Sequence, residues 1–202
     1  MHGHRKHGRH ATPLTIGDQF PTYNLRAVVG GNLSTVEARR PDDYFTPVTS
    51  DDYAGKWRIV TFWPEDFAAA CPDEVAAFGG LYDAFADRGA QVLGVSVDDE
   101  FAHLRWRARH EALKFIPFPM LSDPERELTA ATGGLNADGF AERATFIVDP
   151  DNEIRFVSVG TGFAGRDVDE ALRTLDALQS AGNPGNARRH ATAPGGLPPV
   201  RG

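Results

Sequence analysis

The chain has one cysteine and no long apolar run, and both shortages limit what it can be. Among its 202 residues only Cys71 carries a thiol. A single cysteine cannot close a disulfide within its own chain or build a zinc site from several thiolates. It can therefore serve in packing, in chemical reactivity or in pairing with another molecule. No apolar run approaches the roughly 20 residues that cross a bilayer, and the N-terminal MHGHRKHGRH lacks the hydrophobic segment of a secretory signal. We therefore expect a cytoplasmic protein.

Acidic residues are missing from both ends of the chain. Residues 1–14 and 181–202 carry three basic residues each and no acid, although the whole chain has a net charge of −7. The region between them is therefore strongly acidic, which argues against duplex nucleic acid as the main partner. Composition predicts a flexible His-rich tail over residues 1–12, one globular domain over residues 13–180 and a flexible Gly/Pro-rich tail over residues 181–202.

Hydrophobic patterns in the central domain predict alternating strands and helices. Strands are expected at 58–63, 91–97, 144–148 and 153–159, and helices after residue 71, near 100–113, after residue 124 and around 168–178. The turn sequence Asp149-Pro-Asp-Asn152 predicts that the last two strands form an antiparallel hairpin. Right-handed crossovers would make the first two strands parallel and place helices on both faces of the sheet. This order is that of an α/β protein with a thioredoxin-like fold and a central mixed sheet.

Cys71 stands between a strand that ends at Trp63 and a helix that contains Val75. Free backbone N–H groups and the positive end of the helix dipole favour an anion there, which lowers the pKa of a thiol below its reference of about 8.5. Lone cysteines often act only as small buried hydrophobes, and that interpretation remains open. We favour a reactive thiolate, because the cysteine follows a proline-bounded loop and begins an amphipathic helix.

The residues around Cys71 resemble a known family. The stretch from Pro64 to Glu74, PEDFAAACPDE, is similar to the peroxiredoxin active-site loop P-x-x-x-T/S-x-x-C, which continues as C-P-T/S-E. Further similar segments are TIGDQFP (15–21), GKW (55–57), FPMLSD (118–123) and RATFIVD (143–149). Residues 14 to about 180 resemble the alkyl hydroperoxide reductase C group of actinobacteria. The chain is thereby identified as a member of the peroxiredoxin family.

The resemblance implies a thiol peroxidase that acts on hydrogen peroxide and small organic hydroperoxides. Cys71 would attack the terminal peroxide oxygen and become a sulfenic acid, while Arg143 would hydrogen-bond both the thiolate and the peroxide. Pro64 would shield the sulfur from water, and Glu74 would orient arginine side chains. Lowering the thiol pKa from about 8.5 to about 6 raises the thiolate fraction near neutral pH only about tenfold or slightly more. Donors fixed around the peroxide oxygens must therefore contribute more, and Arg143 and the backbone N–H of Cys71 are the candidates.

The resemblance also implies which partners to expect. They are a hydroperoxide substrate, an external thiol or redoxin protein as reductant, and further copies of the chain in a dimer or a ring of dimers. No cofactor, metal, nucleic acid or membrane is expected to take part.

Two features depart from the family pattern. Ala68 stands where relatives have a Thr or Ser hydroxyl, and the loss of one such donor costs on the order of 10²–10³ in rate. A resolving cysteine is missing from the C-terminal tail, where Gly182-Asn-Pro-Gly-Asn-Ala187 stands instead. We expect a one-cysteine peroxidase whose sulfenic acid is reduced by an external thiol. The alternative is a degenerate oligomeric peroxide sensor or chaperone with weak peroxidase activity.

Other conspicuous residues are assigned no catalytic role. The four N-terminal histidines are expected to bind metal only adventitiously, and Gly133-Gly134 is expected to cap a helix. His103, Trp106 and His110 lie on one predicted helix and are interpreted as structural, with Trp106 near the active-site loop. Asp73 is ambiguous, because a carboxylate suits a helix start but disfavours a nearby thiolate.

Overall fold

The structure is a computed structural model that describes residues 12–33, 40–68, 71–160 and 168–181. Apart from Thr12 and Ala181, the tails predicted over residues 1–12 and 181–202 lie outside this range. The segment 182–187, which stands in place of a resolving cysteine, lies outside it as well. Within the described residues no helix is long and apolar enough to cross a membrane.

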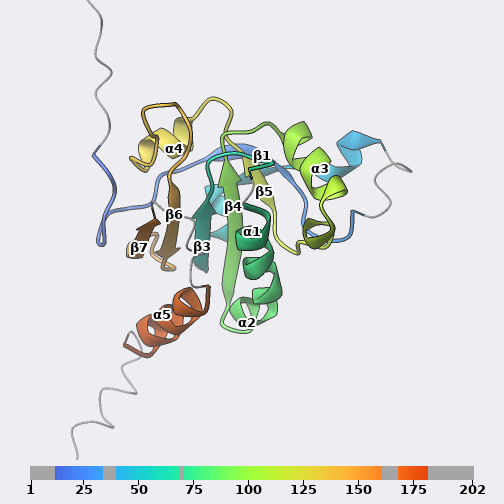
Figure 1. The fold of residues 1–202 in the computed structure, drawn as a ribbon. Helices are drawn as coiled ribbons and strands as arrows, with labels where there is room; N and C mark the ends of the chain where they lie inside the picture. The colour runs from blue at the N-terminus through green and yellow to red at the C-terminus, as the bar shows by residue number, and fades with distance from the viewer. Residues whose placement is uncertain (1–11, 34–39, 69–70, 161–167, 182–202) are drawn as a thin grey trace, which may run out of the picture.

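Strands and helices alternate through most of the chain (Figure 1). The strands are β1 (Asn24–Val28), β2 (Phe45–Thr49), β3 (Trp57–Phe62), β4 (Ala90–Ser96), β5 (Met120–Ser122), β6 (Arg143–Val148) and β7 (Ile154–Gly160). The α-helices are α1 (Cys71–Gly80), α2 (Tyr82–Ala86), α3 (Glu100–Arg109), α4 (Glu127–Ala131) and α5 (Val168–Ala181). Short 3-10 helices cover Pro41–Tyr44, Ser50–Tyr53 and Glu111–Leu113.

The strands form one mixed sheet in the order β2-β1-β5-β4-β3-β6-β7. Strands β3, β4 and β5 are parallel neighbours, as right-handed crossovers predict, and β6 runs antiparallel to β3. The predicted hairpin is confirmed, because β6 and β7 pair antiparallel across the turn at Asp149–Asn152. In this arrangement the carboxyl ends of β3, β4 and β5 meet at one edge of the sheet, where polar side chains from separate segments can come together.

Three strands and one helix break differ from the sequence-based prediction. Strands β1 and β2 were not predicted, because their residues are partly exposed and β2 contains Pro47, which suits an edge of a sheet. Strand β5 has only three residues, too few for a pattern. The helix after Cys71 stops at Gly80 and resumes as α2, in keeping with the low helix propensity of Gly79 and Gly80.

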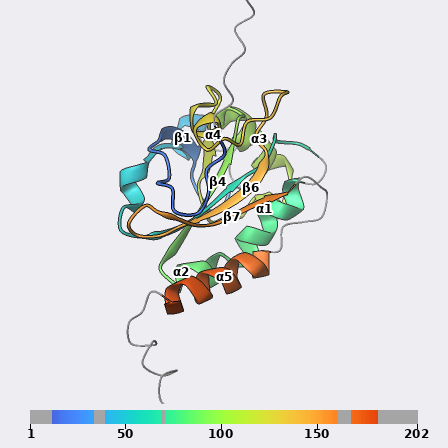
Figure 2. The same cartoon turned by 90° about the vertical axis from the view of Figure 1, so that its left-hand side faces the viewer.

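Helices cover both faces of the sheet, and each face has its own hydrophobic cluster. Ile59 of β3 packs in a cluster with residues of α1, α2 and α5, while its neighbour Val60 packs on the other face in a cluster that includes Leu128 of α4. This alternation follows from the two-residue period of a strand buried on both sides. Helices α2 and α5 lie side by side (Figure 2), and Arg88 pairs with Asp176 between them at 2.5 Å.

Candidate active site

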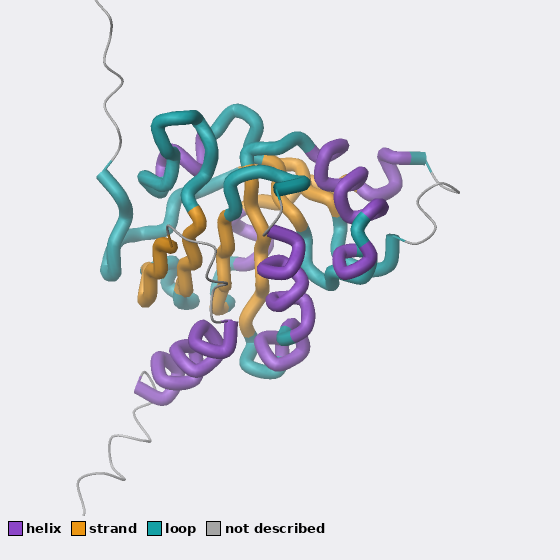
Figure 3. Tube along the Cα trace, in the orientation of Figure 1, coloured by secondary structure: helices purple, strands orange, loops and turns teal. Residues whose placement is uncertain are grey.

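The loop between β3 and α1 is held by buried side chains at the carboxyl end of β3. It extends from β3 toward α3 (Figure 3). The indole Nε1 of Trp63 donates to Oδ1 of Asp66 at 2.9 Å, and the backbone N–H of Asp66 donates to Oδ2 of Asp98 at 2.8 Å. Because Asp98 follows β4, the loop is tied to the neighbouring parallel strand. These bonds fix the first part of the loop, from Trp63 to Asp66, that precedes α1, whose first residue is Cys71.

Asp66 also forms a completely buried pair with His103 of α3. Oδ2 of Asp66 lies 2.7 Å from Nδ1 of His103, and Nε2 lies 3.1 Å from the carbonyl oxygen of Leu121. A carbonyl can only accept, so Nε2 carries a proton. Burial lowers the pKa of His103, but the charge and hydrogen bond of Asp66 outweigh it, and the pKa lies above its ordinary value. The positively charged imidazole is therefore favoured, paired with the Asp66 carboxylate.

Helix α3, which carries His103, is anchored by a second buried cation. The guanidinium of Arg107 donates to the carbonyl oxygens of Val29, Gly31, Leu113 and Ile116 at 2.5–3.2 Å. Burial lowers the pKa of Arg107 to about 10, which leaves it charged at neutral pH. Four carbonyl oxygens take the place of a carboxylate here. They fix the helix that faces the active-site loop.

Phe67 has a strained backbone at the tip of this loop. Its φ is 61°, in the left-handed region, which costs roughly 1–2 kcal/mol for a residue with a side chain. Its ring is about half exposed and lies 6.3 Å from the ring of Trp106, which is almost fully buried and packs 6.0 Å from Trp63. The expected position of Trp106 near the active-site loop is confirmed. Backbone strain of this kind clusters at functional sites.

Arg143 and Glu74 meet although they are 69 positions apart in the chain. Arg143 begins β6, next to β3, and its Nε donates to Oε2 of Glu74 at 3.2 Å. Glu74 lies in the first turn of α1 and is 8% exposed, and its Oε1 has no hydrogen-bond partner among the described residues. Glu74 thus holds the guanidinium of Arg143 at the first turn of α1, the helix that begins with Cys71.

Of the predicted site residues, the structure brings Arg143 and Glu74 together at the first turn of α1. Pro64 follows β3 in the loop and is partly buried, and Ala68 packs against the hydrophobic cluster that contains Trp63. Asp73, the ambiguous acid, is exposed. Gly133 has a φ of 73° just after the last residues of α4, which confirms the predicted helix cap.

Sequence analysis gave no role to Asp66 and assigned His103 only a structural one. Their pairing across 37 positions depends on the fold and leaves no local signal. The one local hint in the sequence is that Asp66 stands in a loop directly after an apolar strand. A carboxylate there needs a hydrogen-bond or charged partner when the loop packs inward.

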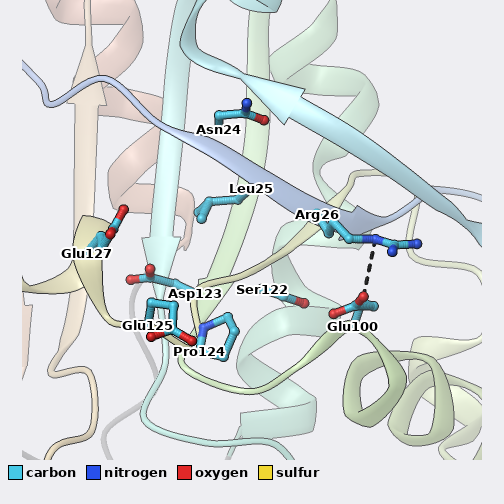
Figure 4. A pocket seen from close by; sticks show the side chains of 9 residues that line it. All are labelled: Asn24, Leu25, Arg26, Glu100, Ser122, Asp123, Pro124, Glu125 and Glu127. Atoms are coloured by element: carbon cyan, nitrogen blue, oxygen red, sulfur yellow. Dashed lines mark ion pairs between the residues drawn. The ribbon is translucent and has the colours of Figure 1, made fainter.

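A hollow of about 240 Å³ lies away from this site, between β1, β5 and the starts of α3 and α4 (Figure 4). Two of its four carboxylates are already engaged: Glu100 pairs with Arg26 at 3.2 Å, and Asp123 accepts the backbone N–H and the hydroxyl of Thr129 at 2.7 Å. Among the described residues no group of three or more potential ligands could hold a metal ion. We assign this hollow no binding or catalytic role.

The chain has a thioredoxin-like fold in which Cys71 begins the helix after β3, an arrangement found among thiol peroxidases. The chain matches the AhpC/TSA family over residues 16–157 and belongs to this family of peroxiredoxins. It is therefore an enzyme that reduces peroxides with electrons from thiols.

Individual relatives agree with this assignment. Alkyl hydroperoxide reductase C of Mycolicibacterium smegmatis is 70% identical over 167 residues, which cover 83% of this chain and 86% of that protein. The protein of the same name from Mycobacterium tuberculosis is 65% identical over the same shares. The solved structure of Mycobacterium tuberculosis AhpC matches with a TM-score of 0.80 at 63% identity and covers 85% of this chain and 96% of that chain. Reduced 2-Cys peroxiredoxin of Plasmodium vivax matches with a TM-score of 0.73 at 30% identity, covering 83% of each chain.

Proposed function

We propose that the chain is a one-cysteine peroxidase for hydrogen peroxide and small organic hydroperoxides. The supporting observation is the Arg143–Glu74 ion pair at the first turn of α1, the helix that begins with Cys71. Peroxide bond cleavage moves negative charge onto oxygen, and a fixed guanidinium beside the nucleophile stabilises that charge. The free N–H groups of the same helix start favour the thiolate.

In the proposed reaction the Cys71 thiolate attacks the terminal oxygen of the hydroperoxide. An S–O bond forms and the O–O bond breaks, so the sulfur is oxidised to a sulfenic acid. The leaving oxygen takes a proton and departs as water or an alcohol. Arg143 donates hydrogen bonds to the thiolate and the peroxide, Glu74 orients Arg143, and Pro64 limits access of water to the sulfur.

An external thiol would complete the cycle, because the chain has no second cysteine. Attack of this thiol on the sulfenic acid forms a mixed disulfide and releases water. A second thiol then exchanges with the mixed disulfide and frees Cys71. A single reduced cysteine fits a reducing compartment, in line with a cytoplasmic location.

Ala68 favours a second candidate, a peroxide sensor or chaperone with weak activity. This residue supplies no hydroxyl to the pocket, and the missing donor costs on the order of 10²–10³ in rate. Peroxide consumption with dithiothreitol as reductant separates the two functions. We expect Cys71→Ser to abolish the consumption seen with the native protein. Equal consumption by both proteins would refute the peroxidase.

A homo-oligomer is part of the proposal. Strand β7 lies at one edge of the sheet, where its outer backbone groups can pair with another strand, and its Val159 is 57% exposed. Exposed apolar edge strands are ready surfaces for pairing between chains. Sedimentation velocity tests this assembly, and a monomer at micromolar concentration would contradict it.

A further inference from the structure

A second hollow, of about 380 Å³, lies beside the first turn of α1. It is lined by Phe67 and Ala68 of the active-site loop, Pro72 of α1, Trp106 and Arg109 of α3, and His110, which ends α3. Pro72 directly follows Cys71, so the hollow adjoins the residue to which the proposed chemistry belongs. Its volume lies in the usual range of small-molecule sites, about 300–1,000 Å³.

The charge of this hollow is opposite to that of the protein. Of its six lining residues Arg109 is cationic and none is acidic, although the whole chain carries −7. Arg109 is exposed and makes no ion pair with any of the described residues. The nearest acid along the chain, Glu111, is already paired with Lys114 at 2.7 Å. The guanidinium of Arg109 is therefore available to an anionic ligand.

The remaining walls suit a small organic molecule with a polar end. Trp106 and Phe67 supply two rings 6.3 Å apart, inclined by 52°. Nδ1 of His110 is buried and has no hydrogen-bond partner among the described residues. Such unpaired buried atoms are uncommon and costly, and a ligand that bonds to them recovers that cost. Aromatic walls with a few polar groups are the usual composition of a ligand site.

We propose that this hollow binds the reducing thiol and selects small thiols that carry a carboxylate. The inference rests on the proposed function, because it supplies the external thiol that a one-cysteine peroxidase requires. Arg109 would bind the carboxylate, since a guanidinium matches its planar geometry, and His110 would add a hydrogen bond. The half-exposed ring of Phe67, which packs on Trp106, would contact the carbon chain and direct the thiol toward Cys71.

The reaction served by this site is the reduction of the sulfenic acid. The sulfur of the bound thiol attacks the sulfur of Cys71, an S–S bond forms, the S–O bond breaks, and the hydroxyl leaves as water with the proton of the thiol. A second molecule of the same thiol then exchanges with the mixed disulfide. This exchange releases reduced Cys71, and the two thiols, which have together supplied the two electrons of the reduction, leave as a disulfide.

Two matched probes test the selection. N-acetylcysteine carries a carboxylate, whereas N-acetylcysteamine lacks it and is otherwise alike. The native protein is first oxidised with one equivalent of hydrogen peroxide, and formation of the Cys71 sulfenic acid is recorded by mass spectrometry. Each thiol is then added, and the second-order rate constant for the mixed disulfide is measured in the native protein, in Arg109→Gln and in Arg105→Gln. Arg105 is exposed on the same helix but does not line the hollow, so it is the matched control.

We expect Arg109→Gln to lower the rate constant for N-acetylcysteine about threefold to fivefold, as for an exposed charge pair. The rate constant for N-acetylcysteamine should stay unchanged. Arg105→Gln should alter neither rate, and molar salt should abolish the native preference. Equal effects of Arg109→Gln on both thiols, or no effect, would overturn the subsite and leave the peroxidase standing. Failure of peroxide to oxidise Cys71 in the first step would instead refute the proposed function, and the subsite with it.

Discussion

Asp66 and His103 form a pair in which neither side chain has any exposed surface, with Oδ2 and Nδ1 2.7 Å apart. The pair joins the active-site loop to α3, while a separate bond from the backbone of Asp66 joins the loop to Asp98 after β4. The loop is thus fixed at Asp66 by a charged group rather than by apolar packing alone. Breaking such a buried pair from one side leaves an uncompensated charge.

This pair predicts a stability that depends on pH. The pKa of His103 is raised in the folded protein. The charged pair with Asp66 therefore contributes its full stabilisation below the pKa of an unfolded histidine, about 6.5, and loses it as the pH rises through the pKa of His103 in the folded protein. We expect His103→Gln to lower the free energy of unfolding by about 3 kcal/mol at pH 6 and by less at pH 9. Urea unfolding of both proteins at the two pH values measures this. A difference that stays constant with pH would show that the charge on His103 does not contribute.

Ala68 predicts a gain of activity on substitution. Ala68→Thr restores a hydroxyl beside the proposed peroxide position and should raise the rate of Cys71 oxidation on the order of 10²-fold. Ala68→Val adds nearly the same volume without a donor and is the matched control. Stopped-flow oxidation by hydrogen peroxide compares the three proteins. An equal gain with valine, or no gain with threonine, would contradict the assigned role of the missing hydroxyl.

Arg143 predicts a loss confined to the oxidation step. Arg143→Gln removes a charged donor from the first turn of α1 and should slow oxidation of Cys71 by about 10²–10³-fold. Arg155→Gln removes an arginine from the adjacent strand β7, where it pairs with Asp149 at 3.2 Å, and should leave the rate unchanged. The same stopped-flow assay measures both variants. Comparable slowing by Arg155→Gln would mean that general charge, rather than position, controls the reaction.

Glu74 predicts a smaller loss that depends on Arg143. A hydrogen bond to a charged group contributes roughly 1.5–3 kcal/mol, and we expect Glu74→Gln to slow oxidation about tenfold by releasing the guanidinium. If Glu74 acts only through Arg143, adding Glu74→Gln to Arg143→Gln should have no further effect on the rate. Additive losses in this double-mutant cycle would assign Glu74 an independent role.

The sequence predicted the four strands β3, β4, β6 and β7 but not β1, β2 and β5, which lie together at the other side of the sheet. The runs RIVTFW and QVLGVSV are apolar because β3 and β4 are buried on both faces, and such runs are visible without a structure. Strand β1 and the edge strand β2 alternate irregularly and contain polar residues, and β2 contains Pro47, so their pairing is decided by the rest of the sheet.

The candidate site divides in the same way. Cys71, Arg143 and Glu74 could be placed because they fall in short segments that resemble the family, and the structure brings Arg143 and Glu74 together. The pairing of Asp66 with His103 and the charge of the hollow beside Arg109 depend on how α3 packs against the loop. Neither leaves a periodic or local pattern, so only the tertiary structure shows them.

The central claim is that the folded site makes Cys71 reactive toward peroxide. The most direct test is the second-order rate constant for oxidation of Cys71 by hydrogen peroxide, measured by stopped-flow tryptophan fluorescence and compared with N-acetylcysteine at the same pH. Because we propose Arg143 and the backbone N–H of Cys71 as donors to the peroxide, we predict that the folded protein reacts about 10³-fold faster or more. A rate constant equal to that of the free thiol would contradict the account.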